Sequence, residues 1–326
     1  MGKDGAVSTM TRTLRRTAPV GYLLVIAAGV LFGINAGVSR VPLRAGLDVA
    51  TFTTVRITGG LLVLVLVALL WDRSALRPPP VRRWPLLVGL GLIGIVGLQG
   101  FYNVAIDRLP LGIALLLEYT GPVLVVLWVR FGRRDPVHPR MWPALGLTLL
   151  GLAGVAQVWN GLSFDPLGAA AALAAAVCFA TYFLLGEDRG VSTEPLRHFL
   201  WAFAVGTVAM NAWAPFWEAG ALGSTASGLG RLDGIELPAW SAMVMVIVLG
   251  TVTPFFLLLL AMRTLPATVV SVVAMLEPVV ATVVGWAWFR ESLTLVQVVG
   301  VLIMLTGIAL AQTARRPTAE ATTADT

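Results

Sequence analysis

Two stretches of this sequence repeat each other: AIDRLPLGIALLLEYTGPVLVV at Ala105–Val126 and AMRTLPATVVSVVAMLEPVVAT at Ala261–Thr282. Their prolines align at a fixed spacing, because Pro122 and Pro278 are 156 positions apart (278 − 122 = 156). The same spacing relates Trp84 to Trp240, Gly94 to Gly250, Pro110 to Pro266, Arg134 to Arg290 and Gly151 to Gly307. The second half of the chain is therefore predicted to be a copy of the first.

The beginnings of the two halves also match, in another register. GYLLVIAAGVLFGINAG at Gly21–Gly37 aligns with GAAAALAAAVCFATYFL at Gly168–Leu184, 147 positions later (168 − 21 = 147). The Gly- and Ser-rich stretch Glu218–Glu236 accommodates the difference. We expect one repeat at 19–159 and another at 165–312, flanked by tails at 1–18 and 313–326.

The composition indicates a membrane protein. Hydrophobic residues make up 57% of the 326 residues and charged residues 12%, whereas about a quarter of a soluble domain is charged. The apolar residues lie in runs of the length that a helix needs to cross a bilayer. The sequence thus predicts an all-α integral membrane protein with ten transmembrane helices.

The ten predicted spans follow one another with short breaks, many of which hold Pro or Gly. They are Pro19–Ser39, Ala50–Trp71, Trp84–Ile106, Pro110–Phe131, Met141–Val158, Leu167–Leu185, Pro195–Trp217, Leu237–Met262, Pro266–Phe289 and Leu293–Gln312.

Basic residues between the spans predict the orientation. The formal charge of +6 does not indicate a nucleic-acid partner, because Lys and Arg lie in short clusters between apolar runs. With the N-terminus inside, most of them fall in cytoplasmic segments, as the positive-inside rule requires. Both termini are therefore expected in the cytoplasm, with the protein in the bacterial inner membrane. Cys178 is the single cysteine, so no intramolecular disulfide can form.

Each predicted half holds five spans, an odd number, so the second half must enter the membrane from the opposite side. Inverted-topology repeats are typical of secondary transporters, which bind substrate near the bilayer midplane between the repeats. The duplication therefore predicts a carrier that works by alternating access.

Polar residues inside the spans are the candidate substrate site, because such residues face the bundle interior or a water-filled cavity. The candidates are Asn35, Gln99, Tyr102, Asn103, Glu118, Tyr119 and Tyr182. Gln99, Tyr102 and Asn103 share one helical face by their spacing. Gln99 and Asn103 have an equal alternative, which is to join helices by hydrogen bonds.

Three charged residues within the spans are candidates for coupling or for structural charges: Arg56, Glu118 and Glu277. Arg56 is expected to be structural, with Glu118 as its candidate partner. Glu118 is favoured over Glu277 as the functional carboxylate, because Tyr119, Thr120 and Pro122 crowd around it. Pro122 and Pro278 are expected to kink their helices.

The chain resembles the drug/metabolite transporter superfamily, specifically its EamA-type members, through Leu276–Leu310 and a weaker first-repeat copy around Gly121–Asp135. LLLEYTGPVLVVL (Leu115–Leu127) and CFATYFLLGE (Cys178–Glu187) resemble the threonine/homoserine exporter branch. The resemblance implies two five-helix repeats and outward transport of an amino acid or related metabolite.

Other functions remain open at this point. Uptake, or efflux of drugs, would need no change of fold. An intramembrane enzyme is disfavoured, because the sequence holds no Gly-x-Ser-x-Gly and no HExxH motif. His138 and His198 lack metal-ligand spacing. We expect no cofactor, metal or nucleic acid; the expected partners are a small-molecule substrate and the lipid bilayer, and a homodimer stays open.

Overall fold

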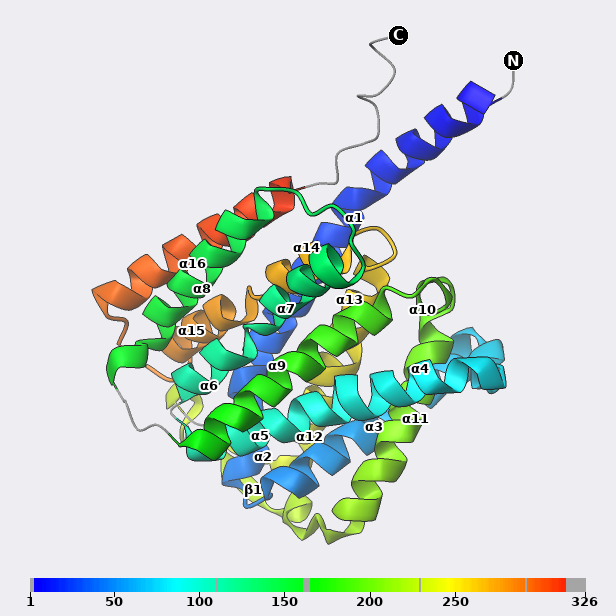
Figure 1. The fold of residues 1–326 in the computed structure, drawn as a ribbon. Helices are drawn as coiled ribbons and strands as arrows, with labels where there is room; N and C mark the ends of the chain where they lie inside the picture. Colours follow the sequence, from blue (N-terminus) through cyan, green and yellow to red (C-terminus); the bar gives the residue numbers. More distant parts are fainter. Residues whose placement is uncertain (1–2, 110, 161–164, 229, 291, 315–326) are drawn as a thin grey trace.

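Long apolar helices follow one another along almost the whole chain in the computed structural model (Figure 1). It describes residues 3–109, 111–160, 165–228, 230–290 and 292–314. The predicted helix start at Pro110 and most of the predicted C-terminal tail lie outside these residues. The first helix begins at Lys3, so the predicted N-terminal tail is continuous with it from that residue on.

The first half runs from α1 to the turn after α8. Its elements are α1 (Lys3–Val38), α2 (Arg40–Arg44), α3 (Val49–Trp71), η1 (Arg73–Leu76), η2 (Val81–Arg83), α4 (Trp84–Val88), η3 (Gly89–Gly97), α5 (Leu98–Arg108), α6 (Leu111–Glu118), α7 (Gly121–Leu127), η4 (Trp128–Gly132), α8 (Met141–Ala156) and η5 (Val158–Asn160).

The second half begins with α9. Its elements are α9 (Pro166–Gly186), α10 (Arg189–Thr193), α11 (Pro195–Trp213), η6 (Phe216–Glu218), η7 (Gly220–Gly223), β1 (Thr225–Ser227), η8 (Gly230–Leu232), β2 (Glu236–Pro238), α12 (Ala239–Ile247), η9 (Val248–Val252), α13 (Thr253–Ala261), α14 (Ala267–Ala274), α15 (Glu277–Ala287) and α16 (Leu295–Thr313).

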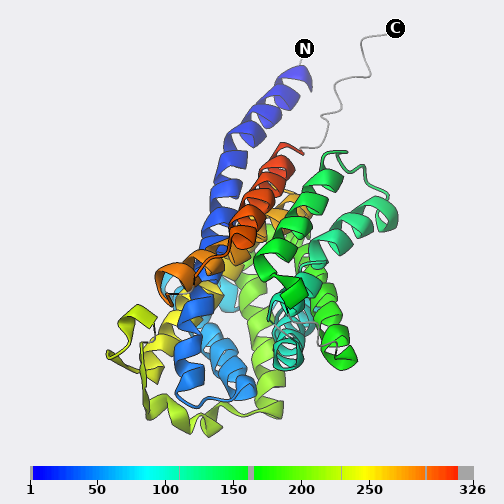
Figure 2. The same cartoon turned by 90° about the vertical axis from the view of Figure 1, so that its left-hand side faces the viewer.

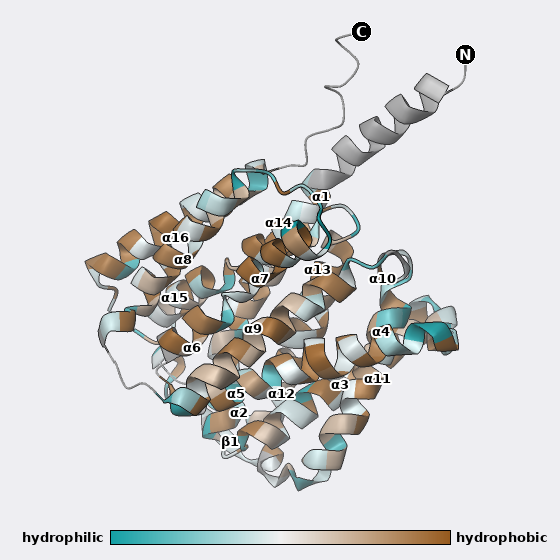
Figure 3. Ribbon diagram, in the orientation of Figure 1, coloured by the Kyte–Doolittle hydropathy of each residue, from teal (hydrophilic) through white to brown (hydrophobic). Residues whose placement is uncertain are grey.

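The apolar helices are suited to a bilayer. Within the described residues, eight helical stretches are long and apolar enough to cross a membrane, and α8 is a shorter apolar helix. The remaining predicted span, α11, is 19 residues long but carries Arg197, His198 and Asn211. Apolar side chains such as Leu66, Leu70 and Val208 are more than half exposed on the outside of the bundle. Figure 3 shows hydrophobic residues along the helices and hydrophilic ones mostly at their ends, which is the pattern of a multi-pass membrane protein.

The two halves break their helices at equivalent places. α6 ends at Glu118 and α7 begins at Gly121, while α14 ends at Ala274 and α15 begins at Glu277. Both intervals lie 156 positions apart, as do the left-handed residues Arg134 (φ 58°) and Arg290 (φ 59°). The predicted spans 110–131 and 266–289 are thus interrupted rather than only kinked. Pro122 and Pro278 each follow the break. A proline has no N–H to donate in the interior of a helix, but it fits the first turn of the helix that begins there.

Helices pack across the two halves in matching pairs. α8 lies along α16, α3 along α11, α5 along α9 and α1 along α13. Small residues allow the α8–α16 contact, since a Cβ added at Gly151 would meet the backbone of Gly300 and Met304. These pairings interleave the halves, so their interface runs through the centre of the bundle.

The bundle has two ends that differ in the elements they carry (Figures 1 and 2). The terminal end holds the C-terminal end of α16 and the side from which α1 enters the bundle. The hairpin end holds α2 and a two-stranded antiparallel sheet, in which Thr225 pairs with Pro238. The nearly all-helical fold agrees with the predicted class, and the sheet adds a detail: the Gly- and Ser-rich stretch closes into a hairpin, and its Gly228 carbonyl accepts a hydrogen bond from Trp288 Nε1 at 3.1 Å.

N-terminal caps fix where two of the spans begin. The Asp48 carboxylate accepts hydrogen bonds from the amides of Ala50 and Thr51 at the start of α3. Asp165 accepts one from the Gly168 amide at 2.8 Å at the start of α9. Hydrogen bonding to Thr51 and to Gly168 lowers the pKa of these two carboxyls, because the bonds favour the charged form.

Candidate functional site

A cavity of about 280 Å³ lies between the two halves of the chain. Its lining comes from α1, α2, α3, α5, α6, α9, α13, α14 and α15. All seven predicted substrate residues line it, as do all three predicted charged residues, of which Glu118 belongs to both sets: Asn35, Gln99, Tyr102, Asn103, Glu118, Tyr119, Tyr182, Arg56 and Glu277. The structure thus brings side chains from both repeats around one space.

Arg56 on α3 is buried and bonded to neutral groups. Its Nε donates to Thr251 Oγ1 at 2.5 Å, its Nη1 to Gln99 Oε1 at 3.0 Å and its Nη2 to the Gly250 carbonyl at 2.8 Å. The expected ion pair between Arg56 and Glu118 is therefore wrong. The π-helical turn η9 places Gly250 and Thr251 beside the guanidinium, and such turns interrupt the regular helical hydrogen bonding.

Glu277 is the cavity carboxylate that is hydrogen-bonded within the protein. Its Oε2 accepts a hydrogen bond from the Tyr119 hydroxyl at 2.9 Å. Glu277 begins α15 and Tyr119 lies in the break after α6. The bond therefore joins the two broken helices, one from each half, at the cavity.

Glu118 and Tyr102 differ from Glu277 in having no internal partner. Among the residues that the structure describes, no group hydrogen-bonds to the Glu118 carboxylate or to the Tyr102 hydroxyl. Glu118 ends α6 and is only partly buried, and both side chains line the cavity. A carboxylate inside a membrane protein needs a cation, water or a proton.

Asn35 and Tyr182 occupy equivalent positions in the two halves, and glycines let helices approach them in the same way. A Cβ added at Gly250 would meet the Asn35 side chain, and one added at Gly94 would meet Tyr182. The Tyr182 hydroxyl donates to the Phe255 carbonyl at 2.7 Å, and Asn35 Oδ1 accepts from Ser39 Oγ at 3.2 Å.

Gln99 and Asn103 each join α5 to α3. Gln99 accepts from Arg56, and Asn103 Nδ2 donates to Thr53 Oγ1 at 2.9 Å. The helix-joining alternative therefore describes these contacts, although both residues also line the cavity.

The sequence reasoning did not single out Thr251 and Gly250, the partners of Arg56, or Arg40 at the cavity mouth. Gly250 was visible only as a repeat match to Gly94. Its role at the site depends on the contact between α3 and η9, which are almost two hundred residues apart in the sequence. A local sequence pattern does not indicate such a contact. The sequence feature that could have indicated this part of the site is Thr251, a hydroxyl-bearing residue in the middle of an apolar run.

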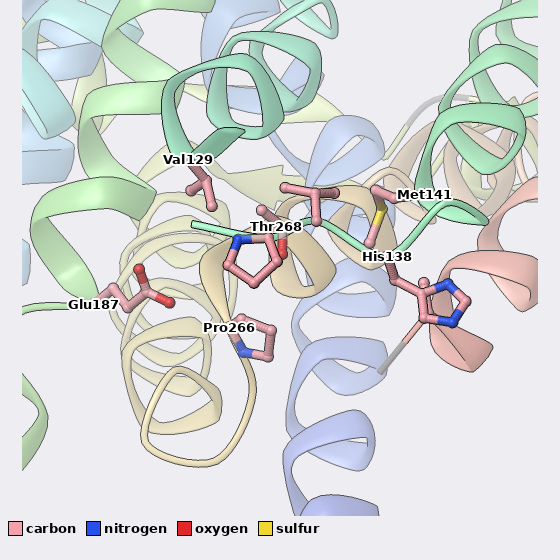
Figure 4. Close-up of a pocket in the computed structure, with 9 residues that line it drawn as sticks. Val129, His138, Met141, Glu187, Pro266 and Thr268 are labelled. Carbon is pink, nitrogen blue, oxygen red and sulfur yellow. The ribbon is translucent and has the colours of Figure 1, made fainter. Parts of the chain in front are cut away.

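A second, much smaller pocket lies at the terminal end (Figure 4). Figure 4 shows Pro266 and Thr268 between Glu187 on one side and His138 on the other. Glu187 directly follows α9, and its two carboxylate oxygens contact two different segments of the chain. Its Oε2 accepts from Arg133 Nη1 at 2.6 Å, and its Oε1 accepts from the Ala267 amide at 3.0 Å. We call these contacts the Glu187 latch; they join the loop after η4 to the ends of α9 and α14.

The described residues contain no group of three His, Cys, Asp or Glu side chains placed to hold a metal ion. The cavity holds neutral hydrogen-bonding groups, the Glu118 carboxylate, the Glu277 carboxylate bonded to Tyr119, and the guanidinium groups of Arg56 and Arg40.

A cavity lined by polar, charged and aromatic side chains of both halves, within a bundle of apolar helices, is the architecture of a membrane transporter for small molecules. The model of the EamA-like transporter family matches the chain twice, at residues 19–157 and 166–313. The chain belongs to this family, which makes it a transporter with two copies of the family domain rather than an enzyme.

Its relatives carry transporter names. The threonine/homoserine exporter RhtA of Salmonella typhimurium (strain SL1344) is 32% identical over 298 residues, covering 90% of this chain and 91% of the relative. RhtA of Escherichia coli (strain K12) is 31% identical over 86% of each chain. An uncharacterized transporter of Archaeoglobus fulgidus is 27% identical over 89% of this chain and 96% of its own length.

A solved crystal structure has the same fold. It aligns with a TM-score of 0.69 at 20% identity, covering 92% of this chain and 98% of that chain. At this identity the likeness speaks for the fold and not for the solute.

Proposed function

We propose that this protein exports a small amino acid of the threonine or homoserine type, and that the central cavity is its binding site. The observation that carries the proposal is the unpartnered Glu118 carboxylate in a cavity lined by both repeats. The names of the RhtA relatives agree with it. Glu118 would hold the ammonium group, since a charged hydrogen bond is worth more than a neutral one.

The carboxylate of the same amino acid would lie toward Arg56. A guanidinium has five N–H donors, and the three contacts of Arg56 leave two for a solute. A hydroxylated side chain would meet the Tyr102 hydroxyl. Asn35, Gln99, Asn103, Tyr119 and Tyr182 complete the proposed site as neutral contacts and as supports for the charged groups.

Alternating access between two inverted five-helix repeats would move the solute. Equivalent segments such as α6–α7 and α14–α15 run in opposite directions between the two ends of the bundle, which supports the inversion. Each pair of helices that packs across the two halves has an equivalent pair related by the repeat. Each repeat can therefore adopt the conformation of the other. Tyr119 and Glu277, at the two helix breaks, are placed to respond to the solute bound at Glu118.

The terminal end would face the cytoplasm, with ten spans and both termini inside the bacterial inner membrane. The support is the Arg-rich set of segments at that end, among them Arg73, Arg83, Arg133, Arg140 and Arg197. Reporter fusions at Thr326 and at Ser224 in the hairpin test the orientation. A cytoplasmic signal is expected at Thr326 and an external one at Ser224; an external signal at Thr326 contradicts the topology.

Metabolite profiling of the medium tests the solute and the direction. Cells that overexpress the chain should release more threonine or homoserine than cells with the empty vector, at equal growth. Glu118→Gln should abolish the increase, while Glu218→Gln, an exposed loop carboxylate, serves as the matched control and should not. Unchanged amino acids in the medium with faster entry of labelled amino acid would contradict export and indicate uptake.

A further inference from the structure

The central cavity has a neighbour of similar size. A side cavity, also about 280 Å³, lies among α3, α5 and α11. Asn103 lines both cavities, and Thr53 lines the side cavity. Asn103 therefore lies between the two spaces, with Thr53 beside it on the side-cavity face.

Thr53 holds the Asn103 side chain in place. Asn103 Nδ2 donates to Thr53 Oγ1 at 2.9 Å, and Thr53 Oγ1 donates to the Val49 carbonyl at 2.8 Å. The chain of hydrogen bonds runs from α5 to the first turn of α3. We call the Asn103–Thr53 pair the partition. The Thr53 hydroxyl proton and one Asn103 amide proton each have an acceptor within the protein, so the pair is held without a solute.

The side cavity suits an apolar group and not a charged one. Its surface includes Val104, Met210 and Trp213, and Val104 and Trp213 are 38% and 69% exposed toward the apolar outside of the bundle. Its single carboxylate, Asp48, is engaged by the amides that it caps. Gly100 opens onto this space, because a Cβ added there would have no heavy atom within 4 Å.

We propose that the Asn103–Thr53 partition determines specificity by limiting the solute to small side chains. A solute with its ammonium on Glu118 and its side chain directed toward α5 meets the partition at Asn103. Without the partition the two cavities become continuous, and amino acids with larger apolar side chains, such as leucine, gain a place for them. This inference rests on the proposed amino-acid export and names what sets its size limit.

The test compares export of labelled threonine and leucine from the same cells. Asn103→Ala should raise the ratio of leucine to threonine export by about tenfold, the scale on which a hydrophobic pocket discriminates between side chains that differ by a few methylenes. Thr53→Ala removes the other half of the partition and should change the ratio in the same direction. It keeps the test decisive if Asn103→Ala does not reach the membrane.

A second substitution separates a gained cavity from a general loosening. Gly100→Leu added to Asn103→Ala should return the ratio to the wild-type value, because the new side chain fills the side cavity. Gly146→Leu added to Asn103→Ala is the matched control: its Cβ is equally unobstructed, but Gly146 lies on α8, away from the side cavity, so the ratio should stay raised.

The outcomes distinguish the inference from the function on which it rests. Wild-type export of threonine together with an unchanged ratio in both partition variants overturns the partition and leaves the exporter standing. Lower threonine export in Asn103→Ala with no gain for leucine assigns Asn103 a direct contact with the solute, which also overturns it. Absence of wild-type export of either amino acid removes the proposed function and the inference together.

Discussion

The two ends of the bundle carry different contacts at equivalent positions of the two halves. Glu187 at the terminal end corresponds to Arg40 at the hairpin end (187 − 40 = 147), and Arg133 corresponds to Phe289 (289 − 133 = 156). At the terminal end these positions form an ion pair, with 2.6 Å between Arg133 Nη1 and Glu187 Oε2. At the hairpin end the Arg40 guanidinium lies over the Phe289 ring, 4.4 Å from its centre.

The central cavity also differs between the two ends of the bundle. Arg40, Ser39 and Leu43 line the central cavity, so it extends to the hairpin end. At the other end the Glu187 latch lies one helical turn beyond the lining residue Phe183, and Glu187 does not line the central cavity. The two repeats share one arrangement of helices, and a few side chains at equivalent positions make their ends differ. We propose that the latch favours a conformation open at the hairpin end.

Holding the latch closed should have the largest effect, a complete loss of export. Cysteines replacing Arg133 and Glu187, in a Cys178→Ala background, can be joined by a short bis-methanethiosulfonate reagent, and a reductant should restore transport. Alternating access requires this end to open in every cycle, so a permanent link stops the cycle. The two single-cysteine variants treated with the same reagent are the controls; normal export by the linked protein contradicts a gate at this end.

Weakening the latch should have a moderate effect on the populations of the two conformations. Glu187→Gln removes the charge from a pair whose side chains are 18% and 35% exposed, which should cost about 1 kcal/mol, or roughly a fivefold shift toward opening of the terminal end. The measurement is the rate at which a maleimide added on the terminal side labels Phe183→Cys in a Cys178→Ala background. Glu194→Gln, from the ion pair between Glu194 and Arg197 at the start of α11 at the same end, should leave that rate unchanged.

The equivalent change at the hairpin end should have the smallest effect. Phe289→Leu removes the ring under the Arg40 guanidinium and keeps the Arg40 charge; this contact is worth about 0.5–1 kcal/mol at an exposed site. Because the cavity already reaches this end, labelling of a cavity cysteine from the hairpin side should change less than about twofold. A change larger than that of Glu187→Gln would reverse the assignment of the closed end.

The sequence predicted the duplication, the order of the apolar helices and the polar faces, because each is a local or periodic pattern. The fixed spacing of 156 reappears in the structure as equal helix breaks after Glu118 and Ala274. The environment of Arg56 was not predictable, since three of its contacts depend on the packing of α3 against α5 and η9. The hairpin was missed because three-residue strands are too short to show an alternating pattern.

Transport by the purified protein in proteoliposomes tests the central claim, that Glu118 in the cavity between the repeats holds the ammonium of a small amino acid. The account predicts that wild-type protein exchanges labelled threonine or homoserine across the bilayer. Glu118→Gln, which keeps the shape but removes the charge, should lose roughly ten- to hundredfold in affinity, the equivalent of about 1–3 kcal/mol, while Glu218→Gln behaves as wild type. Equal exchange by Glu118→Gln and wild type over a range of pH would contradict the account.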